Sequence, residues 1–359
     1  MLLFDFDFSE SPYQEDKAVK DIKFTEKLML LTSFHQKNCL YYGEMLKAVQ
    51  YKKESISHYS ELPFLPVGLL KRLTLSSLPE GALYKVASSS GTSGTNKSRI
   101  ILDGETRIMQ QKALTAIGGD FLGKKRVPML VIDRPQTIEY ENGFSARTAG
   151  ITGFSIFGKN RTFALKENMM PDYEKIQDFL YRYGKESFFV FGFTFLVWNF
   201  FEKLSEMKEY YFDFSNGMIV HGGGWKRLAD KAVSRTDFQK KLKEIAGITQ
   251  IHDYYGMAEQ TGSIFMECEY GHLHCSDFSG IMIRKPEDFS VAKTGEKGII
   301  QTMSLLPGSY PGHNLLTEDE GVILGEDDCP CQRKGVYFQV LGRLKQAEIR
   351  GCSDVYTAD

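Results

Sequence analysis

The strongest constraint on the fold is an alternation of short apolar runs with amphipathic stretches, which begins near Lys85. The apolar runs include 127–132, 188–191 and 218–220, and a helix-like stretch at 172–183 separates the first two. Apolar runs of this length are typical of buried strands, and the amphipathic stretches between them are typical of crossover helices. The alternation therefore predicts an α/β fold built in layers.

Composition excludes several classes of protein. The chain has 359 residues, of which 42% are apolar, and this is enough for two or three subdomains with buried cores. A formal net charge of −2 argues against a nucleic-acid-binding protein, which would show a basic excess. The most apolar run, 188–201, is too short and too interrupted to span a membrane. The acidic start argues against a signal peptide, so we expect a cytoplasmic protein.

A loop rich in serine, threonine and glycine follows the strand-like run 83–86 and ends at Lys97. Glycines in such a loop let the backbone approach an anion, and its hydroxyl and N–H groups can donate to phosphate oxygens. It is not a Walker loop, because Lys97 stands three places after Gly94. A flexible linker would also favour glycine and serine. The candidate phosphate-binding residues are Ser89, Ser90, Gly91, Thr92, Ser93, Gly94 and Lys97.

The sequence patterns before and after the alternating region differ from it. The first 80 residues carry apolar positions at helical spacing, as in 17–31 and 43–51, and Pro63 and Pro66 end that section. Beyond about residue 265, short strand-like runs alternate with glycine and charged turns. We therefore expect a helical N-terminal segment at 1–80, an α/β nucleotide-binding region at 81–265, a small β subdomain at 266–345 and a short mobile tail at 346–359.

Four segments follow the order of the motifs of the adenylate-forming superfamily, and the chain resembles that superfamily over most of its length. They are the loop 89–97, Asp-Tyr-Tyr-Gly-Met-Ala-Glu at 253–259, Leu-Thr-Glu-Asp-Glu-Gly at 316–321 and Gly-Arg-Leu-Lys at 342–345. Members of the superfamily activate carboxylic acids with ATP to form acyl-AMP. The resemblance implies an adenylate-forming N-terminal domain and an acid-activating ligase that uses ATP and Mg²⁺.

The resemblance also implies a role for each matching residue. It implies that Thr92 and neighbouring hydroxyls hold the β- and γ-phosphates, that Lys97 neutralises the departing pyrophosphate and that Glu259 binds Mg²⁺. It implies that Asp319 and Arg343 hold the ribose hydroxyls. Because the reaction brings two anions together, catalysis must come mainly from cationic shielding and positioning. The residues expected to flank the adenine are Gly222, Gly223, Gly224, Tyr255 and Gly256.

These assignments have ordinary alternatives. A glutamate after an apolar strand is usually a solvated turn residue, and only the Tyr-Tyr-Gly context favours Glu259 as a ligand. Asp319 lies in an acidic run that is typical of a solvated turn. Asn96 and Ala258 replace the proline and the threonine usual in the superfamily, which favours a catalytically silent nucleotide-binding module. The chain nevertheless retains the four charged residues expected at the site, and this argues against a silent module; they are Lys97, Glu259, Asp319 and Arg343.

The end of the sequence resembles one short branch of the superfamily. Relatives normally carry a further C-terminal domain with a catalytic lysine, but only nine residues follow Arg350. We therefore expect that domain to be absent. Either the chain belongs to a short-form branch of the superfamily, or it is truncated. Stretches 221–226 and 342–354 resemble acyl-protein synthetases of the LuxE type, which are related to phenylacetate-CoA ligases. This resemblance implies a fatty acid substrate and an acyl reductase or acyl-carrier partner; the alternative is an acyl- or aryl-CoA ligase.

Cys352 is the candidate for carrying the acyl group. It lies two residues after Arg350 in a polar tail, where a cation can lower the pKa of the thiol and a mobile segment can carry a thioester. The alternative is an exposed cysteine with no function. The role of Cys352 depends mainly on the resemblance, in which the acyl group moves from acyl-AMP to a cysteine near the C-terminus.

A second group of cysteines and histidines suggests a metal site. Cys268 and His274 lie in one short stretch, and Cys329 and Cys331 lie on a tight turn later in the chain. Three thiols and an imidazole can form a closed tetrahedral zinc site. The spacing is not that of a standard zinc finger, so unligated thiols packed in a small core are an equal alternative.

The run from 188 to 195 contains five phenylalanines. Such an aromatic strand could line a tunnel for an alkyl chain or fill the hydrophobic core. Core packing is the default, because apolar runs bounded by polar segments are normally buried strands. The preference for an alkyl or aryl acid therefore stays open.

Overall fold

The computed structural model describes residues 4–88, 98–139, 146–207, 209, 211–225 and 232–344. The strands are β1 (Leu65–Pro66), β2 (Lys85–Ser88), β3 (Arg99–Leu102), β4 (Val127–Ile132), β5 (Gly158–Phe163), β6 (Phe188–Phe193), β7 (Gly217–Gly222), β8 (Gln250–Tyr255), β9 (Phe265–Glu267), β10 (Leu273–His274), β11 (Ser279–Arg284), β12 (Lys297–Ser304), β13 (Asn314–Glu326) and β14 (Val336–Arg343). The helices are α1 (Lys17–Asn38), α2 (Leu40–Ala48), α3 (Leu69–Arg72), α4 (Gly104–Leu122), α5 (Gln136–Glu139), α6 (Ala146–Phe154), α7 (Tyr173–Tyr183), α8 (Thr194–Glu206) and α9 (Arg235–Ala246). Short 3₁₀ turns are η1 (Lys53–Ser55), η2 (Tyr59–Glu61), η3 (Ser155–Phe157) and η5 (Ala258–Gln260).

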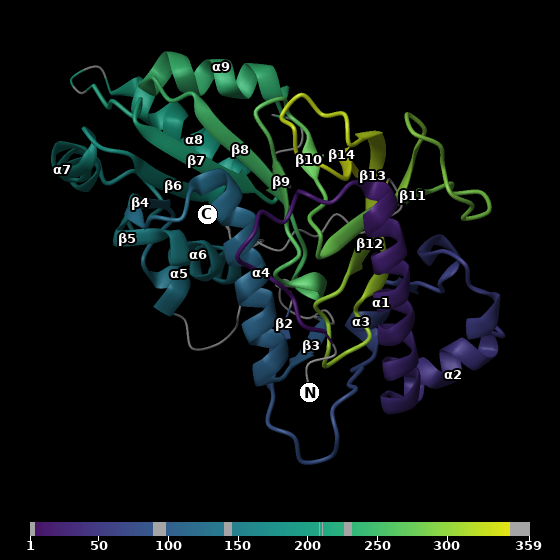
Figure 1. The fold of residues 1–359 in the computed structure, drawn as a ribbon. Coiled ribbons are helices and arrows are strands. Elements are labelled where there is room, and N and C mark those ends of the chain that lie inside the picture. Colours follow the sequence, from purple (N-terminus) through teal and green to yellow (C-terminus); the bar gives the residue numbers. More distant parts are fainter. Residues whose placement is uncertain are drawn as a thin grey trace.

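One continuous sheet carries most of the described strands. Its hydrogen-bonded order is β11-β12-β13-β14-β10-β9-β8-β7-β6-β4-β5, with β1 paired to β13, while β2 and β3 pair separately. Strands β4 to β8 pair in parallel, and those from β8 to β9 and onward pair antiparallel. Figure 1 shows α9 on one side of the parallel part and α4 with α6 on the other.

The layered α/β fold expected from the sequence is thus present, and so is the helical N-terminal segment. The strands beyond residue 265, which the sequence assigns to a small β subdomain, continue the same sheet through the pairing of β8 with β9. Strand β1 also joins that sheet from within the N-terminal segment, by parallel pairing with β13. The domain boundaries themselves stay a prediction.

Strand β6 forms the centre of the core. All six of its residues are buried, which is expected for a parallel strand covered by helices on both faces. The Phe191 ring stacks on Phe154 of α6 with centroids 4.8 Å apart, while Phe188 contacts Phe179 of α7. Burial of each such side chain contributes about 1.5–3 kcal/mol. The phenylalanine run therefore packs in the core, as the default interpretation of the sequence expects.

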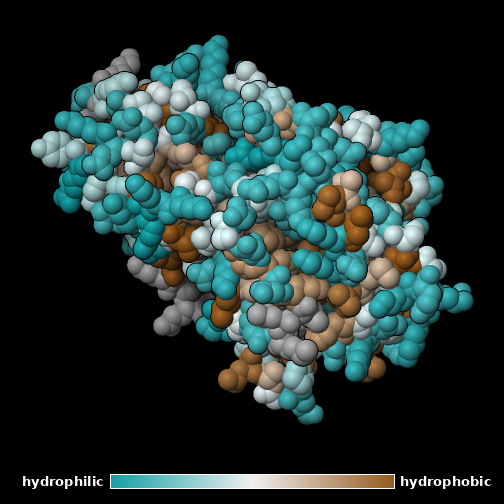
Figure 2. Space-filling view, in the orientation of Figure 1, coloured by the Kyte–Doolittle hydropathy of each residue, from teal (hydrophilic) through white to brown (hydrophobic). Residues whose placement is uncertain are grey.

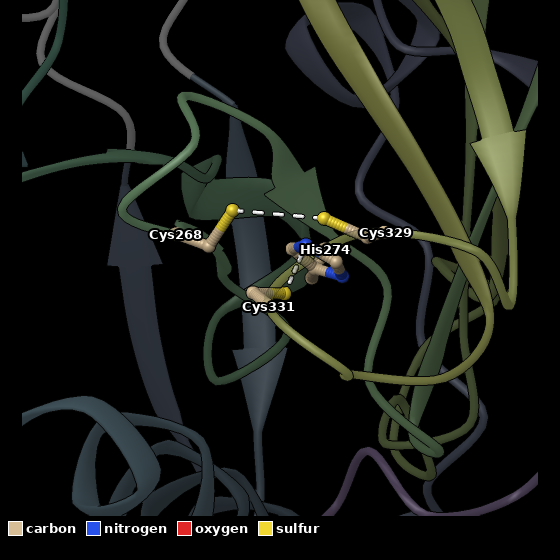
Figure 3. Close-up of side chains that lie close together, drawn as sticks. All are labelled: Cys268, His274, Cys329 and Cys331. Atoms are coloured by element: carbon tan, nitrogen blue, oxygen red, sulfur yellow. Dashed lines mark hydrogen bonds between the residues drawn. The ribbon is translucent and has the colours of Figure 1, made fainter.

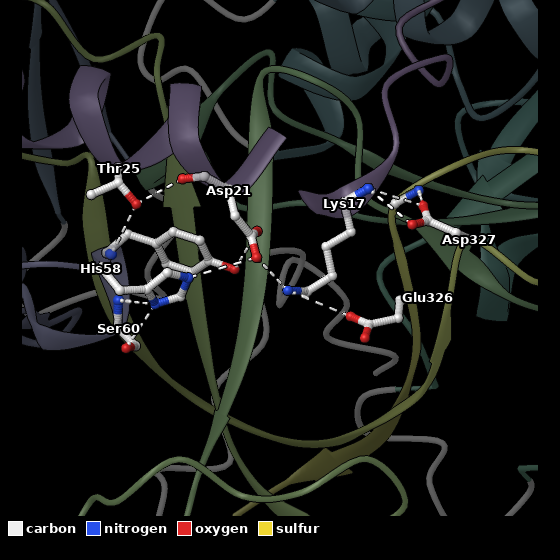
Figure 4. A network of polar contacts seen from close by, with 9 residues as sticks. Lys17, Asp21, Thr25, His58, Ser60, Glu326 and Asp327 are labelled. Carbon is white, nitrogen blue, oxygen red and sulfur yellow. Dashed lines mark hydrogen bonds and ion pairs between the residues drawn. The ribbon is translucent and has the colours of Figure 1, made fainter. Parts of the chain in front are cut away.

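The N-terminal helix α1 is attached to the end of β13 by polar contacts (Figure 4). The backbone N–H of Lys17 donates to Asp327 Oδ2 at 2.9 Å, and its side chain forms ion pairs with Glu326 and Asp21. Asp21 also accepts a hydrogen bond of 3.1 Å from the Tyr59 hydroxyl. These contacts fix the position of the helical segment on the sheet.

Two histidines lie stacked in the interior between α1 and the segment that leads into β13. The rings of His35 and His313 have centroids 5.1 Å apart, and both side chains are fully buried. His35 Nδ1 lies 2.7 Å from Ser77 Oγ and its Nε2 lies 3.0 Å from the Pro307 carbonyl oxygen. Burial lowers the pKa of His35 to about 3, and it lowers the pKa of His313 well below the usual value. Both rings are therefore neutral at physiological pH.

The surface is mixed. Figure 2 shows hydrophilic residues over most of the upper part of one face, with smaller apolar groups between them. Large exposed apolar side chains include Ile22 on α1 and Leu83 before β2. None of the helices in the described parts of the chain combines the length and the apolar character that a membrane span requires.

The buried histidines predict a pH dependence of stability. We expect the free energy of unfolding to fall below about pH 6.5, because the unfolded chain then binds a proton that folded His35 does not bind until about pH 3. One such histidine contributes a slope of at most about 1.4 kcal/mol per pH unit. Urea unfolding at several pH values between about 7.5 and 4.5 gives the free energy of unfolding as a function of pH. This free energy should fall less steeply with decreasing pH in His35→Gln than in wild type. The control is His58→Gln, at a partly exposed histidine, and equal slopes for wild type and His35→Gln would contradict this account.

Candidate functional site

The candidate site lies at the carboxyl ends of the parallel strands β7 and β8. In open α/β sheets, ligands bind outside this edge. Gly222 ends β7 beside Tyr254, and a Cβ on Gly222 would lie 2.5 Å from the Tyr254 ring. Gly223 and Gly224 have φ values of 80° and 64°, which only glycine adopts readily. Gly222 thus allows the close approach of Tyr254, while a Cβ on Gly224 would meet nothing within 4 Å, so the space beside that glycine is open.

Three of the expected site residues meet beside this edge. The Tyr255 hydroxyl at the end of β8 donates to Asp319 Oδ2 at 2.7 Å. Arg343 on β14 pairs with Asp319 in the strand register, and its Nε lies 3.7 Å from Asp319 Oδ1. Burial raises the pKa of Asp319, whereas the hydrogen bond from Tyr255 and the charge of Arg343 lower it. Strand pairing thus brings together three residues that are distant in sequence.

Glu259 lies on the 3₁₀ turn η5, just after β8, and its side chain is only 7% exposed. Its backbone carbonyl accepts a hydrogen bond of 2.7 Å from the Tyr310 hydroxyl. Among the described residues, none donates to its carboxylate or forms an ion pair with it. A carboxylate at a largely buried position next to the strand end offers the oxygen ligands that Mg²⁺ prefers. The residue therefore fits a Mg²⁺ site.

The remaining expected site residues, which are those of the phosphate loop and the proposed acyl carrier, fall outside the described residues. These are the phosphate loop, Ser89 to Lys97, and Cys352 with its surrounding segment 345–359. The strands on either side of the loop, β2 and β3, pair antiparallel with Ser88 opposite Arg99. Their pairing brings the two described ends of the loop together.

Sequence reasoning missed a second pair of polar residues at the same edge. Asp253 on β8 has its Oδ1 3.5 Å from His221 Nδ1 on β7, and its side chain is 43% exposed. Partial desolvation raises the pKa of Asp253 above its usual value, and the nearby Glu267 carboxylate raises it further. Burial lowers the pKa of His221 to about 3. The only signal in the sequence was the place of both residues near a strand end.

A buried ion pair lies at the carboxyl end of β4 and was also missed. Arg147 Nε on α6 donates to Asp133 Oδ2 at 2.8 Å, and a second guanidinium nitrogen contacts the other oxygen. Thr137 donates to the same carboxylate at 2.6 Å. Both charged side chains are at least 94% buried. The pair anchors α6 to the sheet edge, and no motif in the sequence connects its members.

The cysteine and histidine group expected from the sequence is brought together in the structure (Figure 3). Cys268 follows β9, His274 lies in β10, and Cys329 and Cys331 lie on the turn between β13 and β14. The Sγ atoms of Cys268 and Cys329 are 3.9 Å apart, and Cys331 Sγ lies 3.3 Å from His274 Nε2. All four potential ligand atoms lie within 4.8 Å of one another.

Comparison with solved structures defines the class of fold. An open conformation of 2-hydroxyisobutyryl-CoA ligase, in complex with 2-HIB-AMP and CoA, aligns with a TM-score of 0.73 and 13% identity, covering 95% of this chain and 81% of that one. The same ligase in the postadenylation state with 2-HIB-AMP aligns with a TM-score of 0.70 and 14% identity, covering 95% of this chain and 73% of that one. The chain therefore has the fold of adenylate-forming CoA ligases.

Comparison with families places the chain more narrowly. Residues 3–359 match the family model described as acyl-protein synthetase, LuxE, so the chain belongs to this family. A long-chain-fatty-acid–luciferin-component ligase of Aliivibrio fischeri is 28% identical over 52% of this chain and 50% of its own length. A protein of the same name from Vibrio harveyi is 25% identical over 38% of this chain and 35% of its own. The matched region thus spans about half of the first relative and about a third of the second.

The contact between Tyr255 and Asp319 predicts a measurable loss of stability. Tyr255→Phe removes the donor from a mostly buried carboxylate and should lower the free energy of unfolding by about 1–3 kcal/mol. Urea unfolding at neutral pH measures the change. Tyr181→Phe removes a hydroxyl from a side chain that is 88% exposed and serves as the control. An unchanged unfolding curve for Tyr255→Phe would show that the hydrogen bond does not stabilise the fold.

Proposed function

We propose that the protein activates a long-chain fatty acid with ATP to form acyl-AMP and then transfers the acyl group to its own Cys352. The observation that carries the proposal is the meeting of Tyr255, Asp319 and Arg343 at the end of β8, with the largely buried Glu259 on the turn that follows this strand. Membership of the LuxE family supports an acid-activating ligase, and the names of the two relatives support a long-chain fatty acid.

The proposed reaction has two steps, neither of which is a redox step. In the first, a carboxylate oxygen of the fatty acid bonds to the α-phosphorus of ATP, and the bond from that phosphorus to the bridging oxygen breaks. Pyrophosphate leaves with the electron pair. In the second, the Cys352 thiolate attacks the acyl carbon, a thioester forms and AMP leaves. The first step joins two anions, so it needs positive charge and fixed geometry more than a protein base.

The described residues fit these demands. The glycines at the end of β7 and the Tyr255 ring would flank the adenine. The glycines have no side chain to exclude a base, and the tyrosine offers a flat aromatic ring. The Asp319 carboxylate would accept hydrogen bonds from both ribose hydroxyls, while Tyr255 and Arg343 hold it in place. Glu259 would hold Mg²⁺, which supplies charge shielding for the phosphates when bound. Lys97 would neutralise the pyrophosphate.

ATP–pyrophosphate exchange in the presence of Mg²⁺ tests the first step. The assay compares straight-chain fatty acids of several lengths with aromatic acids, and Lys97→Ala is the inactive reference. We expect exchange that depends on a long-chain fatty acid. If none of the acids supports exchange although the protein binds ATP, the proposal is overturned in favour of a silent nucleotide-binding module.

The ribose assignment predicts the behaviour of Asp319→Asn. An amide accepts fewer and weaker hydrogen bonds than a carboxylate, so the KM for ATP in the exchange assay should rise about 10- to 100-fold. The matched control is Asp288→Asn, at an exposed turn before β12, which should leave the KM unchanged. An unchanged KM in Asp319→Asn would remove this residue from the nucleotide site.

The acyl-transfer step predicts a separation of two activities in Cys352→Ser. The variant should retain ATP–pyrophosphate exchange but lose the stable acyl-protein that radiolabelled fatty acid forms with wild type, because serine does not form a thioester. Cys39→Ser, at a cysteine between α1 and α2, is the control and should keep the label. A hydroxylamine-sensitive label that persists in Cys352→Ser would place the acyl group elsewhere.

The same experiment separates the runner-up, an acyl- or aryl-CoA ligase, which is favoured by the likeness to a ligase solved with CoA. That enzyme would release acyl-CoA when CoA is added and would leave no label on the chain. An acyl reductase or acyl-carrier partner and a cytoplasmic location stay predictions.

A further inference from the structure

We propose that Cys268, His274, Cys329 and Cys331 together bind one structural Zn²⁺ ion. This inference is independent of the acid-activating site, because none of the four residues belongs to the nucleotide contacts. It also selects between the two interpretations that the sequence left equal, a zinc site and unligated thiols.

The spacing of the ligand atoms carries the proposal. With Zn–S bonds of about 2.3 Å and a Zn–N bond of about 2.0–2.1 Å, the ligand atoms of a tetrahedral site lie about 3.6–3.8 Å apart. Cys268 Sγ and Cys329 Sγ are 3.9 Å apart, and Cys331 Sγ is 3.3 Å from His274 Nε2. All four atoms lie within 4.8 Å of one another, so small side-chain rotations would bring them to zinc-binding geometry.

The environment of the cluster also suits zinc. Cys268 and His274 are fully buried, and Cys329 is 4% exposed. Three thiolates and one imidazole are a donor set typical of structural zinc and leave no open coordination position for a substrate. His274 Nδ1 is buried without a hydrogen-bond partner among the described residues. The ring can therefore carry its proton on Nδ1, which leaves the lone pair of Nε2 for a metal.

His272 acts from outside the ligand set. Its Nδ1 lies 3.2 Å from Cys329 Sγ, and its ring stacks on Tyr337 with centroids 4.7 Å apart. A partly exposed histidine at that distance can donate a hydrogen bond to a metal-bound thiolate, as outer residues around metal sites commonly do. We therefore assign His272 as a positioning residue.

The ion would connect two parts of the chain that are far apart in sequence. Cys268 and His274 lie on the β9–β10 hairpin, while Cys329 and Cys331 lie on the turn between β13 and β14. The pairing of β10 with β14 and of β9 with β8 places this cross-link within the sheet that also carries Tyr255, Asp319 and Arg343. The zinc would hold the turn against the hairpin and stabilise the antiparallel half of the sheet.

Metal analysis of the full chain tests the proposal directly. The protein is expressed in zinc-supplemented medium, passed through a desalting column with a weak chelator and measured by mass spectrometry of the elements. We expect about one zinc per wild-type chain and less than about a fifth of that in Cys331→Ser. Cys275→Ser, at the buried cysteine next to His274 that lies outside the cluster, is the matched control and should keep its zinc.

A second measurement covers the case in which Cys331→Ser does not fold. Wild-type protein is stripped of metal, refilled with Co²⁺ and examined by absorption spectroscopy, in which tetrahedral thiolate coordination gives intense visible and near-ultraviolet bands. A wild-type chain without zinc, zinc that persists in folded Cys331→Ser, or a weak octahedral Co²⁺ spectrum would each overturn the proposal. All these readouts are independent of ATP–pyrophosphate exchange, so the metal site and the proposed activity can fail separately.

Discussion

The pairing of β8 with β9 is the contact on which the rest of the structure depends. The register of Tyr254 with Met266 and of Tyr255 with Phe265 joins the parallel half of the sheet to the antiparallel half. Without it, the aromatic end of β8 would have no fixed relation to β13 and β14. With it, the Tyr255 hydroxyl reaches Asp319 at 2.7 Å, and one continuous sheet carries both sides of the candidate site.

The proposed chemistry needs fixed polar groups and positive charge, and Lys97, the cation expected to act on the phosphates, lies outside the described residues. A reaction between two anions gains most from cations and from groups fixed before the substrates arrive. Arg343 lies beside Asp319 on paired strands, and Glu259 is buried on a turn that directly follows β8. The pairing of β13 with β14 and the turn after β8 set the backbone positions of these residues.

The sequence predicted the parts of this protein that depend on local pattern. Apolar runs located the parallel strands, as at 127–132, and the order of motifs located the residues that meet around Tyr255. The continuity of the sheet depends on pairings between distant segments, so a single sequence does not show it. The ion pair of Asp133 and Arg147 was missed for the same reason, because its members lie on different elements and share no periodicity. Cysteine spacing indicated four ligands but left open whether they meet.

Binding of a hydrolysis-resistant acyl-AMP analogue tests the central claim most directly, since that claim is that an adenylate lies at the carboxyl edge with its ribose on Asp319. Calorimetry would compare the analogue with a counterpart that lacks both ribose hydroxyls. The account predicts that wild type binds the complete analogue at least about 10-fold more tightly, because the counterpart cannot donate the ribose hydrogen bonds to the Asp319 carboxylate. Equal affinity for the two compounds, or no binding of either, would contradict it.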